Sequence, residues 1–124
     1  MSEQPQTISD SPVDLTEMKK TVGGKMEVIR ALVDHILVDF PEKLHQLRHG
    51  VAVGDAGQVR IIAHTLKSSL ASFGAAEARE IARALEICGA TGELAGAENM
   101  LLQLEHHIER IVVFFSGPDW MDKV

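Results

Sequence analysis

The stretch from Asp55 to Gly74 reads DAGQVRIIAHTLKSSLASFG, and its pattern predicts one amphipathic helix. Its apolar residues recur every three or four positions and define a stripe that faces a core: Val59, Ile62, Ala63, Leu66, Leu70 and Phe73. Asp55 and Gln58 form a capping-box pattern at its start, and Gly74 is a suitable left-handed stop. The stretch therefore predicts a helix with one buried and one exposed face.

Two more helices are predicted before this stretch. A short one begins at Asp14, which forms a capping-box pattern with Glu17. A much longer one begins near Lys25 and continues to residue 47. Pro41 interrupts its apolar pattern, but the pattern resumes in phase, so we expect one kinked helix rather than two. Residues 50–54 are expected to form the loop that follows.

Two further helices are predicted after it, over residues 76–87, with a stop at Gly89, and over residues 93–115. Four substantial amphipathic helices joined by short loops predict an all-α fold, an antiparallel four-helix bundle with a short N-terminal lid helix. The expected organisation is a flexible lead at 1–13, a bundle at 14–115 and a short peripheral tail at 116–124. Trp120 in this tail either folds back onto the bundle or serves as a contact residue.

Composition excludes several classes of function. The chain has 124 residues, a net charge of -6 and only 4% aromatic residues, which disfavours general nucleic-acid binding. Its one cysteine, Cys88, has no intrachain partner and is expected to be a small buried side chain in a cytosolic protein. No secretory signal or membrane span is visible, so we expect no membrane association and a cytoplasmic location.

The face of the 55–74 helix opposite its apolar stripe carries the residues that suggest chemistry. His64 lies there with Lys67 one turn on, and the same face holds Arg60, Ser68 and Ala71. Neutral histidine is a nucleophile near pH 7, and a lysine one turn away can pair with an anion attached to it. The spacing by itself is weak evidence and, taken alone, favours a solvated histidine and lysine on a helix surface.

The wider sequence resembles the histidine phosphotransfer (HPt) domains of two-component phosphorelays. AHTLKSSLASFGA at residues 63–75 is similar to the family signature. The resemblance continues through DFPEKLHQLRHGVAVGDAGQVRIIAHTLKSSLASFGAAEAREIARALE at residues 39–86 and covers roughly residues 14–115. Motif, flanking helices, glycine positions and length all agree with the family.

The resemblance implies that His64 is phosphorylated and relays a phosphoryl group between receiver-domain aspartates. Lys67 then stabilises the phosphohistidine, Gly74 is the small turn residue after the helix, and Ser68 stands where many members carry glycine. The Mg²⁺ for transfer belongs to the receiver, so no cofactor or metal of the chain's own is expected. Whether the chain counts as an enzyme is left open, and no autonomous kinase activity is expected because no nucleotide-binding loop is present.

The resemblance also implies partners and a docking surface. The partners are response-regulator receiver domains and a hybrid sensor histidine kinase, and the chain itself is expected to be a monomer. Receivers of this family dock over the first three helices. Besides Arg60, Ser68 and Ala71, the candidates for docking are Leu15, Met18, Val22, Val28 and Leu32.

Other interpretations stay open at this point. The chain could be an adaptor that keeps the docking surface without carrying phosphate. His45 and His49 are spaced as two ligands on one helical face, although no third ligand is evident. The charged residues of the 76–87 helix are expected to form its solvated face: Glu77, Arg79, Glu80, Arg83 and Glu86.

Overall fold

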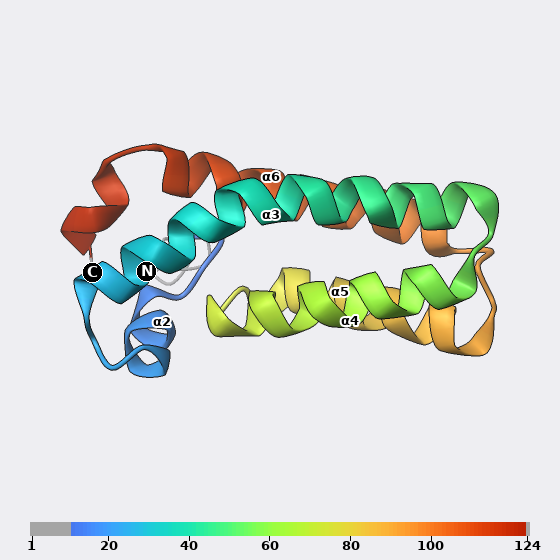
Figure 1. The fold of residues 1–124 in the computed structure, drawn as a ribbon, viewed down its shortest axis with the longest axis horizontal. Helices are drawn as coiled ribbons and strands as arrows, with labels where there is room; N and C mark the ends of the chain where they lie inside the picture. The colour runs from blue at the N-terminus through green and yellow to red at the C-terminus, as the bar shows by residue number, and fades with distance from the viewer. Residues whose placement is uncertain (1–10, 124) are drawn as a thin grey trace, which may run out of the picture.

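The computed structural model describes residues 11–123, and within them the fold is all-helical with no β-strand. The first ten residues of the expected lead lie outside this range. The elements are α2 (Leu15–Thr21), α3 (Met26–Val53), α4 (Ala56–Ser72), α5 (Ala76–Thr91), α6 (Ala97–Ser116) and a short 3-10 helix, η1 (Asp119–Lys123). Successive long helices run in opposite directions, with α3 beside α6 and α4 beside α5 (Figure 1).

Helix α3 is longer than its sequence pattern suggested. It passes through Pro41 and continues to Val53, so the loop expected at residues 50–54 is wrong. Gly50 is a buried helical residue, and only Gly54, at φ 73°, leaves the helical conformation. Gly50 is therefore a packing residue inside the helix, and Gly54 is the left-handed glycine that ends it.

Two aspartates begin helices at the predicted positions, but the return bond of each predicted capping box is absent, because the N–H groups of Asp14 and Asp55 donate to the carbonyl oxygens of Phe73 and Gly50 instead. The Asp14 carboxylate accepts hydrogen bonds from the backbone N–H groups of Thr16 and Glu17 and so starts α2. The Asp55 carboxylate accepts from the N–H of Gln58 and starts α4. These bonds satisfy N–H groups that the first turn of a helix leaves free. The starts of α2 and α4 are therefore readable from the sequence.

Helices α5 and α6 differ from their expected limits. Helix α5 does not stop at Gly89 but continues to Thr91, and Gly92 at φ 78° is its end. A Cβ atom on Gly89 would lie 2.4 Å from the backbone nitrogen of Arg60 in α4. Gly89 is therefore a point of close backbone approach between α5 and α4 rather than a stop. Helix α6 begins at Ala97, four residues later than expected.

Aromatic side chains gather at the end of the molecule where the chain finishes. Phe73 has edge contacts with both Phe40 and Phe115, at ring-centre distances of 6.4 and 5.7 Å. Trp120 packs on Phe115 at 5.2 Å and is only 5% exposed. The tail segment expected to be peripheral thus contributes a core residue, because η1 folds back onto the bundle. No helix in the described part of the chain is both long and apolar enough to cross a bilayer.

Candidate functional site

His64 lies on the exposed face of α4, as the spacing predicted. The opposite face of this helix is buried through Val59, Ala63, Leu66 and Leu70. The His64 side chain is 57% exposed. An imidazole on a helix whose other face is fixed in the core is held in place by a rigid support and stays accessible to another protein.

A carboxylate from the neighbouring helix joins His64 to Lys67. Glu86 of α5 lies with Oε2 at 2.7 Å from His64 Nδ1 and Oε1 at 2.6 Å from Lys67 Nζ. Each carboxylate oxygen thus has its own partner, and both partners come from α4. Lys67 is therefore anchored one turn from His64 through a third residue.

Glu86 is the site residue that the sequence interpretation missed, since it was placed on the solvated face of its helix. Its side chain is only 21% exposed because α5 lies close against α4. Gly89 permits this closeness, because its missing side chain lets the backbone of α5 approach that of Arg60 in α4, and Ala78 and Ala82 are further small buried residues of α5. This small-residue pattern was the available signal, but it does not by itself say which charged neighbour meets His64.

The contacts of Glu86 with Lys67 and His64 favour the ionised form of its carboxyl group. The hydrogen bond from Lys67 lowers the pKa of the Glu86 carboxyl below its ordinary value of 4.5, and the hydrogen bond with His64 lowers it further. Desolvation opposes both effects without overcoming them. An ionised carboxylate only accepts hydrogen bonds, so Nδ1 of His64 is the nitrogen that carries the proton.

The other ring nitrogen of His64 is left as the reactive atom. Within residues 11–123, no hydrogen bond joins its Nε2 to another side chain. With the proton on Nδ1, Nε2 carries a lone pair directed away from Glu86. The arrangement presents a nucleophile, a nearby ammonium group and no enclosed pocket, which suits attack on a group carried by another protein.

The remaining predicted residues of α4 share the exposed side of the helix. Arg60, Ser68 and Ala71 are all exposed, and Ser68 and Ala71 line a shallow groove with Lys67, Arg79 and Arg83. Gly74 follows α4 at φ 64°, and a Cβ atom there would lie 2.5 Å from that of Asp14. Gly74 is thus required both by its backbone conformation and by the close approach of the segment before α2.

The docking candidates outside α4 differ in how much of their side chains is exposed to solvent. Val28 is 39% exposed, and Leu15, Val22 and Leu32 are partly buried against the core. Met18 is fully buried, so its proposed role in docking is wrong. It is the one fully buried residue of α2, and its side chain in the core holds the short helix on the bundle.

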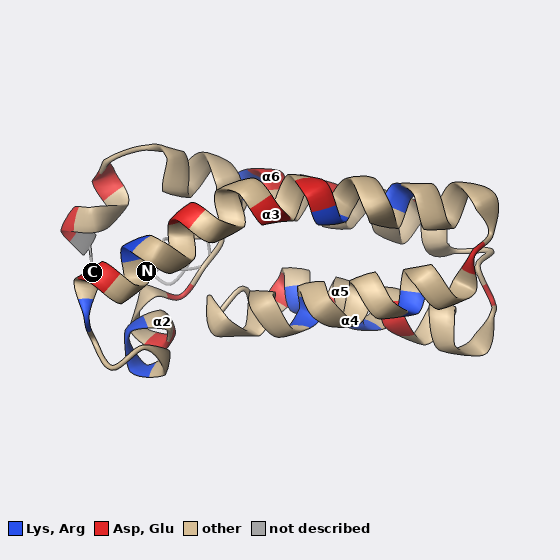
Figure 2. Cartoon of the chain, viewed as in Figure 1, with Lys and Arg blue, Asp and Glu red and all other residues tan. Residues whose placement is uncertain are grey.

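Charged groups near the site are mixed in sign. The charged residues of α4 are all basic, whereas α5 carries both basic and acidic residues (Figure 2). Arg79 and Arg83 of α5 line the same groove as Lys67. Both arginines pair with Glu80, at 3.3 and 3.8 Å. Positive charge is therefore available locally on a chain whose net charge is -6.

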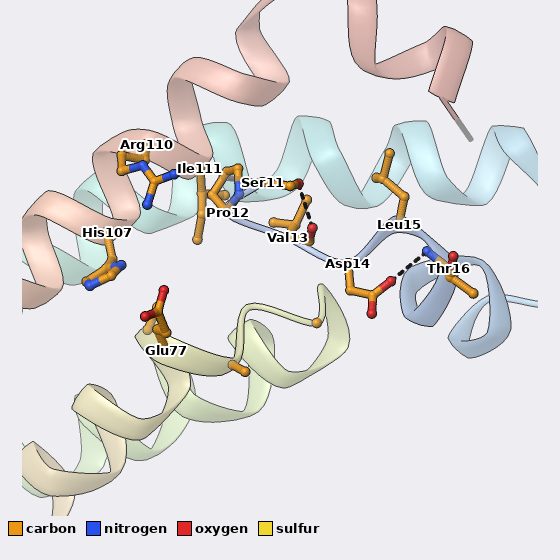
Figure 3. A pocket seen from close by; sticks show the side chains of 13 residues that line it. Ser11, Pro12, Val13, Asp14, Leu15, Thr16, Glu77, His107, Arg110 and Ile111 are labelled. Carbon is orange, nitrogen blue, oxygen red and sulfur yellow. Dashed lines mark hydrogen bonds between the residues drawn. The ribbon is translucent and has the colours of Figure 1, made fainter. Parts of the chain in front are cut away.

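A cavity lies away from His64, at the end of the molecule near α2. It has a volume of about 630 Å³ and is lined by Pro12, Asp14, Glu77, His107 and Arg110, among others. Figure 3 shows the Asp14 carboxylate turned toward the backbone of Thr16, with His107 and Arg110 on the opposite wall. The cavity does not include His64 or Lys67, so it is not part of the candidate site.

The histidine pair considered as a metal site has another contact. Nδ1 of His49 lies 3.4 Å from Oε1 of Gln58, and His45 is exposed. Among the residues that the structure describes, no group of three or more histidine, cysteine, aspartate or glutamate side chains is placed to hold a metal ion. Cys88, expected to be buried, is partly exposed, with its sulfur 3.7 Å from that of Met100.

Comparison with known proteins identifies the family. A search of curated protein sequences found no match. The fold is similar to the crystal structure of histidine-containing phosphotransfer protein B (HptB) from Pseudomonas aeruginosa PAO1, with a TM-score of 0.79 and 24% sequence identity. The similarity covers 85% of this chain and 91% of HptB. The Hpt domain model matches residues 31–113, more than half of the chain and including the whole His64 site. The chain therefore belongs to the Hpt domain family, whose members act in two-component phosphorelays.

Proposed function

We propose that this chain receives a phosphoryl group on Nε2 of His64 from the aspartate of one receiver domain and passes it to the aspartate of another. The observation that carries the proposal is the exposed imidazole whose Nδ1 is held by Glu86 at 2.7 Å. Phosphoryl transfer depends mainly on in-line positioning and charge stabilisation, so a nucleophile and a neighbouring cation are sufficient on this side of the interface.

Lys67 is the proposed stabiliser of the phosphoryl group. Its Nζ is anchored on Glu86 at 2.6 Å, and an ammonium group has three donors, so it can keep this bond and donate to a phosphoryl oxygen as well. The receiver domain supplies the divalent cation and the aspartate. The chain's own contribution is then His64, Lys67 and the antiparallel four-helix bundle, with α2 as its lid, that holds them rigidly.

The proposed partners are response-regulator receiver domains and a hybrid sensor histidine kinase, met in the cytoplasm by a monomeric chain. The docking surface we propose surrounds His64 with Arg60, Ser68 and Ala71 and extends to Val28 at the start of α3. Leu15, Val22 and Leu32 contribute their exposed edges to it. Arg60 and Lys67 supply local attraction for an acidic receiver surface despite the net charge of -6.

The test is transfer of labelled phosphoryl groups from a phosphorylated receiver to wild type, His64→Gln and His35→Gln. His35 is a matched control, because it is also an exposed histidine that lies near a carboxylate. We expect acid-labile, base-stable label on wild type and on His35→Gln, and none on His64→Gln. Undiminished acid-labile label on His64→Gln would refute the assignment, and failure of every receiver to label wild type would favour the adaptor role.

A further inference from the structure

A shallow groove runs between α4 and α5, from Lys67 toward the start of α2. Two hollows form it, with volumes of about 420 and 230 Å³, and both are lined by Ala71 and Arg79. The first hollow includes Lys67, and the second reaches Glu17 of α2. Because Lys67 lies one turn from His64 along α4, the groove begins beside the candidate site.

The residues between the charged side chains of the groove are small. Ser68 and Ala71 come from α4, and Gly74 and Ala76 come from the turn into α5. Ser68 and Ala71 are both exposed. A segment of another protein can therefore lie close to the surface of α4 here without meeting a large side chain.

The half of the groove beside His64 is basic. Lys67, Arg79 and Arg83 line it, and Glu80 is the one acidic residue among its lining side chains. Acidic residues outnumber basic ones on α3 and α6, whereas basic residues outnumber acidic ones on α4 and α5 (Figure 2). The groove is thus a local concentration of positive charge on a chain whose net charge is -6.

The two arginines can bind a carboxylate of another protein in addition to their present partner. Arg79 and Arg83 each place one guanidinium nitrogen near Glu80, at 3.3 and 3.8 Å. Their side chains are 45% and 60% exposed, and ion pairs at such exposed positions are weak. A guanidinium group has several N–H donors in a planar fork, so donors remain for a second carboxylate.

We propose that this groove receives an acidic segment of the partner receiver, next to its phosphorylated aspartate, and that Arg79 and Arg83 thereby determine which receivers bind. The inference rests on the proposed phosphotransfer at His64 and extends the docking surface from α2, α3 and α4 to α5. Charge complementarity supports it, because carboxylates beside the incoming phosphoryl group meet cations here rather than the acidic remainder of the chain.

Glu80 makes the expected effects differ in sign. Its carboxylate repels an acidic segment and occupies donors of both arginines, so removing its charge should strengthen binding. Neutralising Arg79 and Arg83 should weaken binding. If these side chains only supported the fold, both changes would act in the same direction, because both break the same ion pairs. Opposite effects therefore distinguish docking from support of the fold.

The experiment compares wild type with Glu80→Gln and with the double variant Arg79→Gln, Arg83→Gln. The control is Arg48→Gln, because Arg48 is also 45% exposed and pairs with glutamates, but on α6 and outside the groove. Initial transfer rates are measured against the concentration of the phosphorylated receiver that labels wild type most rapidly, at low and at high salt. Circular dichroism verifies that each variant is folded.

In the double variant we expect KM for the phosphorylated receiver to rise about threefold to tenfold at low salt. The maximal transfer rate should change less than about twofold, since these charges act on binding and not on the reacting atoms. Glu80→Gln should lower KM about twofold, and Arg48→Gln should match wild type. The differences should shrink at high salt, which screens exposed charges.

A second measurement does not depend on phosphotransfer. The ¹⁵N-labelled protein is titrated with a hexaglutamate peptide, and a hexalysine peptide serves as the control probe. We expect hexaglutamate to shift the amide NMR signals of residues 67–83 in wild type and in Arg48→Gln, and much less in the double variant. Hexalysine should leave these signals nearly unchanged.

An unchanged KM in the double variant, a higher KM in Glu80→Gln, or equal shifts from the two peptides would overturn the role of the groove. None of these results affects the proposed function, which fails only if label does not depend on His64. If no receiver labels wild type, the proposed function fails, and the peptide titration still decides whether the groove binds an acidic segment.

Discussion

Among the residues that the structure describes, two places bring together a histidine, a carboxylate and a lysine, and they differ in how they are built. In α3, Asp39 lies 4.0 Å from His35 and 3.0 Å from Lys43, with all three residues spaced four apart on one helix. At the candidate site, Glu86 lies 2.7 Å from His64 and 2.6 Å from Lys67 and comes from a different helix. The first group follows from local spacing and the second from tertiary packing.

The difference shows what the packing of α5 against α4 contributes. Along one helix, the carboxylate approaches its lysine but stays at the limit of ion-pair distance from its histidine. Across two helices, one carboxylate reaches both partners at hydrogen-bond distance. Spacing along one helix is therefore enough to place a histidine, a carboxylate and a lysine near one another. Close packing of two helices is needed to bring the carboxylate within hydrogen-bond distance of the histidine, and this bond fixes the tautomer that a nucleophilic histidine needs.

Replacing each lysine by alanine is expected to give the largest contrast. In Lys67→Ala the rate of phosphoryl transfer to His64 should fall about tenfold to a hundredfold, because the anionic group loses a charge-assisted hydrogen bond. Lys43→Ala removes an equivalent charge from the α3 group and should leave transfer unchanged. Radiolabel transfer from a phosphorylated receiver measures both. Equal transfer rates in Lys67→Ala and Lys43→Ala would show that Lys67 has no part in the mechanism.

Widening the contact between α4 and α5 is expected to have the next largest effect. A Cβ atom on Gly89 would lie 2.4 Å from the backbone nitrogen of Arg60 and 2.7 Å from the carbonyl oxygen of Ala56. Gly89→Ala should therefore cost about 1–3 kcal/mol of unfolding free energy, as overpacking does, and slow transfer by moving Glu86. Urea denaturation measures the stability.

Gly57→Ala is the matched control for this helix contact. Gly57 is also helical, but the nearest atom to an added Cβ is Oδ1 of Asp55 at 3.6 Å. Alanine there should stabilise the fold by up to about 1 kcal/mol, because it restricts the unfolded backbone. If Gly89→Ala were as stable as Gly57→Ala, close backbone packing would not be what brings Glu86 to His64.

The smallest expected effect is on the pH dependence of stability. The hydrogen bond from Lys67 lowers the pKa of Glu86 in the folded chain below its ordinary value of 4.5. A carboxyl group shifted in this direction stabilises the folded state above its unfolded pKa and loses that contribution as pH falls through the folded pKa. The stability of wild type relative to Glu86→Gln should thus be constant near neutrality and decline below pH 4.5.

Thermal unfolding of both proteins between pH 3 and pH 7 measures this difference. Comparing the two curves removes the contribution of the other carboxylates, which both proteins share. A wild-type advantage that grew as the pH fell would show that Glu86 is not held in its ionised form by its neighbours.

The sequence predicted what depends on local spacing. The apolar stripe of α4, the aspartate caps of α2 and α4, and the exposed position of His64 all follow from residue periodicity and side-chain chemistry. The ends of α3 and α5 were misplaced because Gly50 and Gly89 are packing residues. The contacts of Glu86 with His64 and Lys67 were not predicted for a similar reason, since they depend on how closely α5 approaches α4.

The burial of Met18 and Trp120 also depends on tertiary structure. Each lies in a short segment whose helical pattern spans few turns, so periodicity gives little information on which side faces the core. Met18 points inward from α2, and Trp120 packs against Phe115 of α6. The docking surface is therefore smaller than expected because it lacks Met18, and the core is larger because it includes Trp120 of the tail.

We infer that Glu86 holds Nδ1 of His64 so that Nε2 takes the phosphoryl group. The most direct test is NMR of the phosphorylated protein with ¹⁵N-labelled histidine, which reveals the nitrogen coupled to phosphorus. We predict coupling to Nε2 of His64, with a protonated Nδ1 near neutral pH. Coupling to Nδ1 of His64, or to a nitrogen of His35, would contradict the account.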